Sequence, residues 1–459
     1  MIIGAVMVPH PPIAVSEIGK GEEKKIQPTL DSFHAMARFV KQLRPETILL
    51  ITPHSICYRD WFNVSDGARA YGDFSNYRAP SVQFEVRYDQ DFTDRLTDFC
   101  EREGFPAGTQ YDREKYLDQG TMVPLYFLNQ EYTDYKLVRL SFSGMSLAEH
   151  YRYGMMLQKL CEGNDRRYLI MASGDLSHCQ KEDGPYGFRE EGVLYDERIM
   201  KTMSTGNFLE LLEYDSVFLE KAEECGHRSF TVMAGALDAM AVRPKPLTHE
   251  ATLGVGYGFV LYEIAGRDHS RNFLDQYETK LRESIRSRSQ DPWVALARKT
   301  IETWIRERRI TSIPSNCPKE LLEKQAGVFV SIHENGMLRG CIGTIMPVQM
   351  CVAEEIVHNA ISACSRDPRF DPVRVEELPY LEISVDVLSE PEVCEKDQLD
   401  VKRYGVICST ADGKRGLLLP DLDGVDSVDQ QIAIACSKGG IDPEIDHVIL
   451  ERFEVIRHA

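Results

Sequence analysis

The chain has 459 residues, too many for one ordinary domain, and 43% hydrophobic with 27% charged residues is the composition of a globular protein. Its net charge of -19 argues against broad, non-specific binding to nucleic acid or to anionic membranes. No apolar run is long enough to span a bilayer, and the start, MIIGAVMVPHPP, is expected to be a first strand rather than a signal peptide. Twelve cysteines without CxxC spacing indicate a reducing, cytoplasmic setting.

Residues 1–265 alternate apolar strands with amphipathic helices. The periodicity predicts strands over 2–8, 47–52, 168–173 and 253–265, and helices over 28–43, 90–103, 146–161, 191–212 and 228–241. Continuous apolar runs such as TILLIT are typical of parallel strands that are buried on both faces. The first 265 residues are therefore expected to form an α/β domain with a mainly parallel sheet.

The remainder of the chain differs in charge and in its pattern of predicted elements. Residues 266–290 are strongly charged and are predicted to be a linker that is partly helical. Residues 291–459 are expected to form an α+β domain, with helices over 293–308 and 348–364, strands over 327–332 and 381–389, an Asn335-Gly336 turn, and a hairpin of 405–410 with 415–421.

Three of the predicted strands run directly into a histidine. AVMVPHPP ends at His10, ILLITPHS at His54, and LIMASGDLSH at His178. Ligands of open α/β sheets bind beyond the carboxyl ends of the strands, so these side chains are expected to share one crevice. Acidic residues are near: Asp175 precedes His178, and Glu223 and Glu224 precede a predicted helix.

Two imidazoles and one carboxylate leave open positions on Fe(II) or Mn(II), which is what oxygen activation or substrate chelation requires. A third histidine near the open face would serve as an acid and base. A single histidine after a strand is more often a surface or capping residue, and it is the repetition of the context that favours a shared site.

The motifs VPHPPI, ITPHS, SGDLSH and ECGHRSF, taken in order, resemble the class III extradiol ring-cleavage dioxygenases of the LigB type and their Memo-like relatives. The resemblance covers residues 1–265. It implies that His10 and His54 are iron ligands and that His178 is the catalytic acid and base. Asp175 or Ser177, in the same Gly-Asp-Leu-Ser-His turn, is expected to orient the His178 ring by hydrogen bonding.

The same resemblance leaves two candidates for the third ligand. The dioxygenases have a glutamate there, which points to Glu224, whereas the Memo-like relatives have a cysteine in a Cys-Gly motif, which Cys225 matches. Glutamate implies Fe(II), and cysteine implies copper or zinc. Neighbouring side chains diverge, so only one of the two is expected to bind the metal, and Glu224 is slightly favoured.

The second domain carries the motif MLRGCIGTIMP. Gly340 and Gly343 permit close approach of a ligand, and Arg339 could depress the pKa of the Cys341 thiol, although a bulged strand with a buried cysteine explains the motif equally well. RGCIG, SRDPRF and RGLLLPD resemble the AMMECR family over about residues 290–459. Asp367 and Arg369 are expected either to face the same cleft or to pair around Pro368.

A LigB- or Memo-like domain joined to an AMMECR domain resembles the AmmeMemoRadiSam set, in which the two domains occur with a radical SAM protein. This resemblance implies a radical SAM protein as a partner. The first domain is expected to be a metal-dependent oxidoreductase acting on a small, catechol-like or otherwise chelating molecule. The alternative is a metal-binding or interaction protein that has kept the fold and lost ring cleavage.

Overall fold

The computed structural model describes residues 1–459 except 111–115, 164, 289, 335, 423 and 444. The chain divides into two compact units, Met1–Glu278 and Thr279–Ala459. The predicted linker, 266–290, contains the end of one strand and helix α9 (Phe273–Arg288), and the boundary between the units falls inside this helix. Phe273 and Leu274, at the start of α9, are buried in the core of unit 1.

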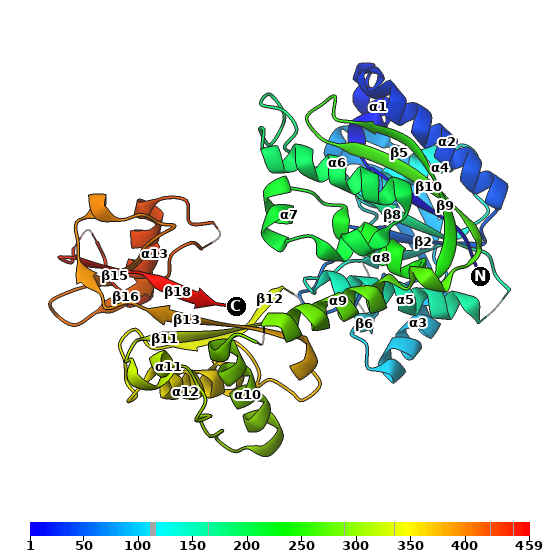
Figure 1. Cartoon of the computed structure of the whole chain (residues 1–459). Coiled ribbons are helices and arrows are strands. Elements are labelled where there is room, and N and C mark those ends of the chain that lie inside the picture. Colours follow the sequence, from blue (N-terminus) through cyan, green and yellow to red (C-terminus); the bar gives the residue numbers. More distant parts are fainter. Residues whose placement is uncertain (111–115, 164, 289, 335, 423, 444) are drawn as a thin grey trace. The chain divides into compact units, whose positions relative to one another are not determined.

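Unit 1 is built on one six-stranded sheet (Figure 1). Its strands, in spatial order, are β7 (Lys136–Ser141), β2 (Thr47–Thr52), β8 (Tyr168–Ser173), β1 (Ile2–Val8), β10 (Tyr257–Arg267) and β9 (Met240–Glu250). The first four are mutually parallel, whereas β10 pairs antiparallel with β1 and β9 pairs antiparallel with β10. The predicted α/β class with a mainly parallel sheet is confirmed.

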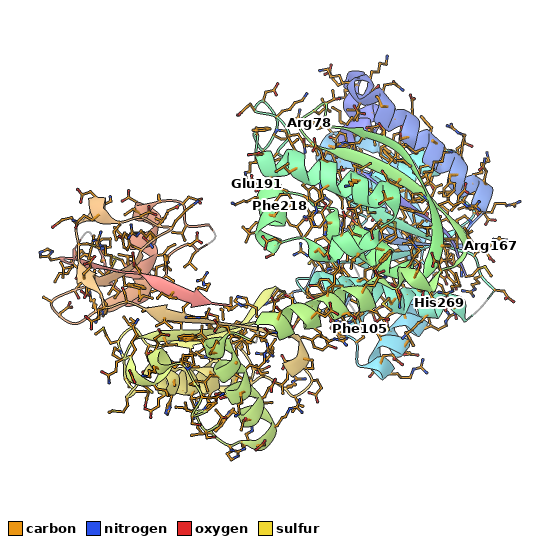
Figure 2. All side chains as sticks on the ribbon, in the orientation of Figure 1. Arg78, Phe105, Arg167, Glu191, Phe218 and His269 are labelled. Atoms are coloured by element: carbon orange, nitrogen blue, oxygen red, sulfur yellow. The ribbon has the colours of Figure 1, made fainter. Side chains whose placement is uncertain are left out.

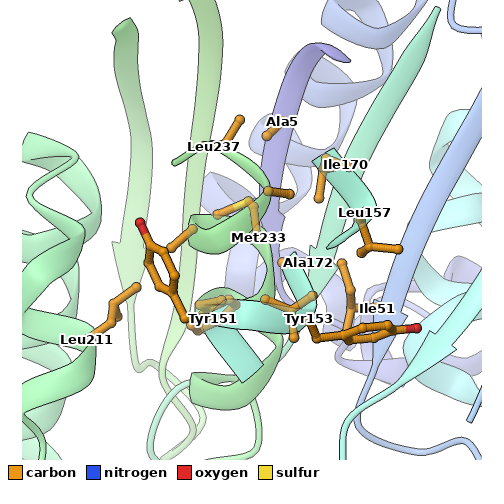
Figure 3. Packing of buried hydrophobic residues seen from close by; sticks show 14 of the residues in the cluster. Ala5, Ile51, Tyr151, Tyr153, Leu157, Ile170, Ala172, Leu211, Met233 and Leu237 are labelled. Carbon is orange, nitrogen blue, oxygen red and sulfur yellow. The ribbon is translucent and has the colours of Figure 1, made fainter. Parts of the chain in front are cut away.

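Helices cover both faces of this sheet. They are α1 (Ser16–Gly19), α2 (Gln27–Leu43), α3 (Gln90–Glu103), α4 (Gln119–Leu128), α5 (Leu147–Glu162), α6 (Glu190–Thr205), α7 (Ser216–Ala222) and α8 (His227–Ala236). Alternate residues of the central strands enter two separate cores. Ala5 and Ile51 pack with side chains of α5 and α8 (Figure 3), whereas Val6 and Leu50 pack with side chains of α2 and α4. This two-sided burial is the reason why these strands are continuously apolar.

Unit 1 also has two small sheets, β3 (Phe62–Asn63) with β6 (Ala107–Gly108), and the hairpin β4 (Arg69–Phe74) with β5 (Ala79–Arg87). Helices α6 and α7 lie next to each other. The Glu191 carboxylate of α6 is 3.7 Å from the Lys221 ammonium of α7. Glu191 is labelled in Figure 2, together with Phe218 of α7.

Three predicted elements of unit 1 need correction. The helix predicted over 191–212 ends at Thr205, because Gly206 adopts a left-handed conformation and a 3-10 turn, Phe208–Glu213, follows. The helix predicted over 228–241 ends at Ala236, and Met240 already begins β9. The strand predicted over 253–265 is β10, which begins at Tyr257 and forms a hairpin with β9 that the periodicity did not indicate.

Unit 2 has two four-stranded antiparallel sheets with helices, as the predicted α+β class requires. One sheet contains β12 (Met337–Gly343), β11 (Val328–Glu334), β13 (Leu381–Leu388) and β18 (Val455–His458). The other contains β14 (Glu392–Val393), β17 (Ile449–Phe453), β15 (Gly405–Ser409) and β16 (Arg415–Leu418). The helices are α10 (Pro292–Glu307), α11 (Lys319–Glu323), α12 (Val352–Ser365) and α13 (Val428–Gly439).

The predicted hairpin of unit 2 is β15 with β16, and the predicted helix over 348–364 begins later, at Val352. Asn335, half of the predicted turn, lies outside the described residues. Within the described parts of the chain, no helix combines the length and the apolar character needed to cross a membrane.

Candidate metal centre

His10 stands just after the end of β1 and is 2% exposed. Its Nδ1 is 3.0 Å from the Oγ of Ser173, and that hydroxyl donates to the carbonyl oxygen of Gly120 at 2.6 Å. Because the single proton of the Ser173 hydroxyl is used on Gly120, Ser173 accepts from Nδ1–H of His10. In the neutral form of the ring, this leaves the lone pair of His10 on Nε2, the nitrogen that faces away from Ser173 and can bind a metal ion.

His54 stands two residues after β2 and meets His10 edge-on. The two Nε2 atoms are 3.0 Å apart, and because the Nε2 of His10 lacks a proton, His54 donates to it. Burial of the ring, followed by the neighbouring His10, lowers the pKa of His54 to about 4, although the residue as a whole reaches solvent. The His54 imidazole is thus neutral near pH 7, as a metal ligand must be, and an ion between the two rings would take the place of the proton between them.

Cys225 completes the group from the turn between α7 and α8. Its Sγ lies 3.6 Å from the Nε2 of His10 and accepts the backbone N–H of Asp175 at 3.3 Å. The turn can approach this closely because two glycines meet there: a Cβ on Gly174 would lie 2.1 Å from the Cα of Gly226. Burial, and then the carboxylates of Asp175 and Glu224, raise the pKa of the Cys225 thiol in the metal-free protein.

Two of the three distances between the donor atoms are those expected for a single ion. In the described part of the chain, His10, His54 and Cys225 form the group of potential ligands whose donor atoms all lie within 4.8 Å of one another. Donors bound to one ion at about 2.0–2.3 Å are about 3–4 Å apart, and the measured 3.0 and 3.6 Å agree with this. Two imidazoles and a thiolate suit copper or zinc, whereas Fe(II) oxygenases use two imidazoles and a carboxylate.

Glu224 is directed elsewhere. Its Oε2 accepts the backbone N–H of His227 at 2.6 Å, in the first turn of α8, where a carboxylate also complements the helix dipole. Burial raises the pKa of this carboxyl group. Of the two candidates for the third ligand, the structure brings Cys225 to the histidines and leaves the Glu224 side chain at the helix terminus.

His178 lies beside this group rather than within it. Its Nδ1 donates to the backbone carbonyl of Glu223, which can only accept, so Nε2 is the ring nitrogen left to take up or release a proton. A positive charge on His178 would be one of the smaller causes of the lowered pKa of His54, after burial and the charges of nearer groups. His178 is oriented by Glu223, and neither Asp175 nor Ser177 makes that hydrogen bond.

Asp175 instead holds His10. Its Oδ1 accepts the backbone N–H of His10 at 2.7 Å, and its Oδ2 lies 3.9 Å from the Nε2 of the same residue. The backbone N–H of Asp175 donates to the Cys225 thiol, so Asp175 links the ends of β1 and β8 to the α7–α8 turn. The carboxylate is thus adjacent to the proposed ligands, but it contacts no atom of His178 by a hydrogen bond among the described residues.

Several residues of the site carry no motif in the sequence. Thr52, the last residue of β2, donates its hydroxyl to the Asp118 carboxylate. The same carboxylate caps α4 by accepting the backbone N–H of Thr121, and it forms an ion pair with the fully buried Arg139 at 3.3 Å. A Cβ on Gly120 would lie 2.5 Å from the Thr52 hydroxyl, so the α4 terminus packs directly under the site. In the sequence, the Asp-x-x-Thr pattern of a helix cap indicates part of this network. No sequence pattern indicates the contact of Ser173 with Gly120.

The motif residues of unit 2 adjoin a cleft of about 920 Å³ between the two sheets. Cys341, Gly343 and Arg369 line the cleft, and the Cys341 Sγ accepts the Ser331 hydroxyl at 3.2 Å. Asp367 does not line the cleft but lies next to residues that do. Its carboxylate accepts the Cys341 N–H at 2.9 Å and two hydrogen bonds from the Arg369 guanidinium.

The other two motif residues have structural contacts. Arg339 donates to Glu377 at 2.6 Å and to the carbonyl oxygen of Asp371 at 2.7 Å. Gly340 packs on α12, where a Cβ would lie 2.3 Å from the carbonyl oxygen of Ala363. Neither residue lines the cleft.

Comparisons with known proteins agree with this division. Residues 4–260 match the family described as the catalytic LigB subunit of aromatic ring-opening dioxygenase, and residues 294–458 match the AMMECR1 family. A protein of Clostridium acetobutylicum is 39% identical over 469 aligned positions, which cover 99% of this chain and 98% of that one. A Thermotoga maritima protein is 44% identical over 171 positions, which cover 37% of this chain and 98% of its own.

Among solved structures, an uncharacterized protein from Pyrococcus horikoshii is 30% identical and covers 36% of this chain and 88% of its own, with a TM-score of 0.34. The sheet, the strand-end histidines and the family match define unit 1 as a domain with a dioxygenase-like fold. The chain belongs to the LigB family, and its LigB domain is followed by an AMMECR1 domain.

Proposed function

We propose that unit 1 is a metal-dependent oxidoreductase whose ligands are His10, His54 and Cys225. The observation that carries the proposal is the convergence of three donor atoms from three distant segments, with the Nδ1 of His10 held at the Ser173 hydroxyl. Metal-binding histidines donate their second ring N–H to a neighbouring acceptor, and Ser173, fixed by the Gly120 carbonyl, offers such an acceptor to His10.

The donor set favours copper or zinc as the metal, because a thiolate is a soft ligand. Bound copper would supply one-electron redox chemistry, and either metal would act as a Lewis acid toward a chelating oxygen. Fe(II) is the second candidate, because the LigB match covers residues 4–260, which is most of unit 1. Iron would favour the Glu224 carboxylate as a ligand, and Glu224 would then have to leave the N-terminus of α8.

His178 is proposed to accept the proton that the substrate releases when it binds. A catechol-like or similar chelating substrate loses a proton from a hydroxyl as it binds, and the free Nε2 of His178 is available to accept it. The hydrogen bond from Nδ1 to the Glu223 carbonyl fixes the tautomer and stabilises the imidazolium that results. A positioned imidazole of this kind typically contributes about 10²–10⁴-fold to the rate.

The AMMECR1 unit is proposed to serve the same pathway, with a radical SAM protein as the partner of the chain. The shared pathway is supported by the Clostridium acetobutylicum relative, which aligns with both domains over nearly its full length, and the radical SAM partner is proposed from the family resemblance alone. Co-purification of a radical SAM protein with the tagged full chain, but not with unrelated tagged baits, tests this part of the proposal. Absence of such a protein from repeated purifications would remove it.

Metal content tests the main proposal. The full chain is purified without chelators, loaded with copper, zinc or Fe(II), and desalted, and the bound metal is measured by mass spectrometry. We expect about one ion per chain in the wild type and none in His10→Ala or His54→Ala. His269→Ala, a solvent-exposed histidine labelled in Figure 2, is the matched control and should keep the ion. Stoichiometric metal in both site variants would refute the proposal.

A further inference from the structure

The cleft of unit 2 has a polar floor, which is one face of the sheet formed by β12, β11, β13 and β18. On β11, Ser331 and His333 line the cleft, whereas Val330 and Ile332 belong to the other face and are fully buried in the core with α10 and α12. Ser384 of β13, directly opposite Ser331, also lines the cleft. Two sheets that only pack on each other bury apolar side chains between them, so this polar face indicates space for a polar ligand.

Three polar side chains of the cleft have no partner in the described part of the chain. Neither His333 nor Ser384 makes a side-chain hydrogen bond there, and Lys438, in the last turn of α13, forms no ion pair. Burial lowers the pKa of His333, so its ring is neutral near pH 7 and offers one donor and one acceptor. These three side chains are therefore available to a ligand.

Cys341 lies in the same floor, beside Ser331. The two residues are directly opposite each other on β12 and β11, and the Ser331 hydroxyl donates to the Cys341 sulfur at 3.2 Å. Arg369 reaches Cys341 from the segment after α12, where its Nη2 donates to the Cys341 carbonyl oxygen at 3.1 Å. The Arg369 side chain is 54% exposed and lines the cleft, so the guanidinium is also accessible to a bound molecule.

Arg369 also acts on the Cys341 sulfur. The pKa of Arg369 is raised first by its hydrogen bonds to Asp367, and further by the charge of the Cys341 thiolate and a hydrogen bond to it. Asp367 fixes both partners, because its carboxylate accepts the Cys341 N–H at 2.9 Å and the Arg369 guanidinium at 2.7 Å. A hydroxyl and a guanidinium at one sulfur stabilise the thiolate, which is the nucleophilic form of cysteine.

The wall of the cleft opposite this floor is apolar. It is formed by β16 and the segment that follows, through Leu417, Leu419 and Leu422. The cleft volume of about 920 Å³ lies within the range of about 300–1,000 Å³ that is typical of small-molecule sites. A ligand of this cleft is therefore a small molecule with a polar side and an apolar side.

We propose that this cleft is an active site of its own, in which the Cys341 thiolate takes up the acyl group of a small, partly polar ester or thioester. The thiol proton passes to solvent, and the sulfur forms a bond to the acyl carbon. The bond from this carbon to the leaving group breaks, and the leaving group departs with the electron pair.

The other side chains of the cleft have distinct roles in this step. Arg369 stabilises negative charge on the Cys341 sulfur and then on the carbonyl oxygen of the substrate. Ser384 and His333 bind the polar part of the substrate through their unused donors and acceptors. The site lies wholly within unit 2, so it does not depend on the metal centre proposed for unit 1.

The first test measures nucleophilicity with iodoacetamide. The full chain is alkylated near neutral pH, and the rate at each cysteine is followed by peptide mass spectrometry. Cys317 is the internal control, because it belongs to the same unit, is half-buried like Cys341 and does not line the cleft. We expect Cys341 to react at least about tenfold faster than Cys317, and to lose most of this advantage in Arg369→Gln and in Ser331→Ala. Arg309→Gln, at an exposed arginine of unit 2, is the control of equal charge and should keep the advantage.

The second test uses p-nitrophenyl acetate as the acyl donor. We expect the wild type to release a burst of about one p-nitrophenolate per chain and to carry the acetyl group on Cys341 in the peptide map. Cys341→Ser should lose the burst, whereas Cys317→Ser should keep it. Fast alkylation of Cys341 without acylation would overturn the acyl-transfer assignment. Equal alkylation of Cys341 and Cys317, unaffected by Arg369→Gln and Ser331→Ala, would overturn the site as a whole.

Discussion

The contact of Gly174 with Gly226 provides a steric test of the site, because it determines how close Cys225 comes to His10. In Gly174→Ala the new Cβ would lie 2.1 Å from the Cα of Gly226, and 3.1 and 3.2 Å from its backbone N and C. Carbon atoms normally stay about 3.5–4.0 Å apart, so the turn must retreat by about 1.5 Å. Overpacking of this kind costs about 1–3 kcal/mol.

The same movement acts on the ligands. A retreat of the turn would lengthen the 3.6 Å between Cys225 Sγ and His10 Nε2 beyond the about 3–4 Å that is usual between two donors of one ion. We therefore expect Gly174→Ala to fold with a Tm lowered by a few degrees and to bind the metal at least about tenfold more weakly.

The assay is a competition titration of the metal against a chromophoric chelator, with the Tm measured on the same samples. Gly163→Ala is the control, because a Cβ there has only an ordinary contact, 3.9 Å from the carbonyl oxygen of Leu160. If Gly174→Ala lowers the Tm but keeps wild-type metal affinity, the Cys225 thiol is not held at the metal through this contact, and the reasoning fails.

Three further predictions concern single side chains. Ser173→Ala removes the acceptor of the His10 Nδ1–H and should lower metal affinity by about 10- to 100-fold in the same titration; unchanged affinity would contradict the assigned tautomer. His178→Ala should keep the metal and the fold but lose about 10²–10⁴-fold in turnover of any substrate that the wild type converts; loss of metal would make His178 a ligand. The hydrogen bonds from Arg369 hold the pKa of Asp367 well below its usual range, so this stabilising effect is full above about pH 4 and is lost as the pH falls further; Asp367→Asn should flatten the acid side of the stability profile measured by thermal unfolding, and a profile of wild-type shape would contradict it.

The part of the site that follows from strand ends could be predicted from the sequence. His10 and His54 follow continuously apolar strands, and parallel strands buried on both faces present their carboxyl ends at one edge. The position of Cys225 could not be predicted in this way, because it depends on the contact of Gly174 with Gly226, which are far apart in the sequence. The support of His10 by Ser173 and Gly120 is equally non-local.

The missed elements of the fold have local reasons. β9 contains Pro244 and Pro246 among charged residues and does not read as a strand, but it is an edge strand, where proline is tolerated. Helix α4 contains Pro124 and is apolar on all sides, because it is buried beneath the site, so it lacks the helical periodicity that the sequence reasoning relied on. Both elements acquire their structure from packing that single-sequence patterns do not contain.

The identity of the third ligand is the most direct test of the account. The bound metal of the loaded full chain is measured in Cys225→Ser and in Glu224→Gln, which keeps an oxygen to accept the His227 N–H. The structure predicts that Glu224→Gln keeps about one copper or zinc ion per chain and that Cys225→Ser loses it. Retention in Cys225→Ser together with loss in Glu224→Gln would contradict the assignment and indicate an iron site of the dioxygenase kind.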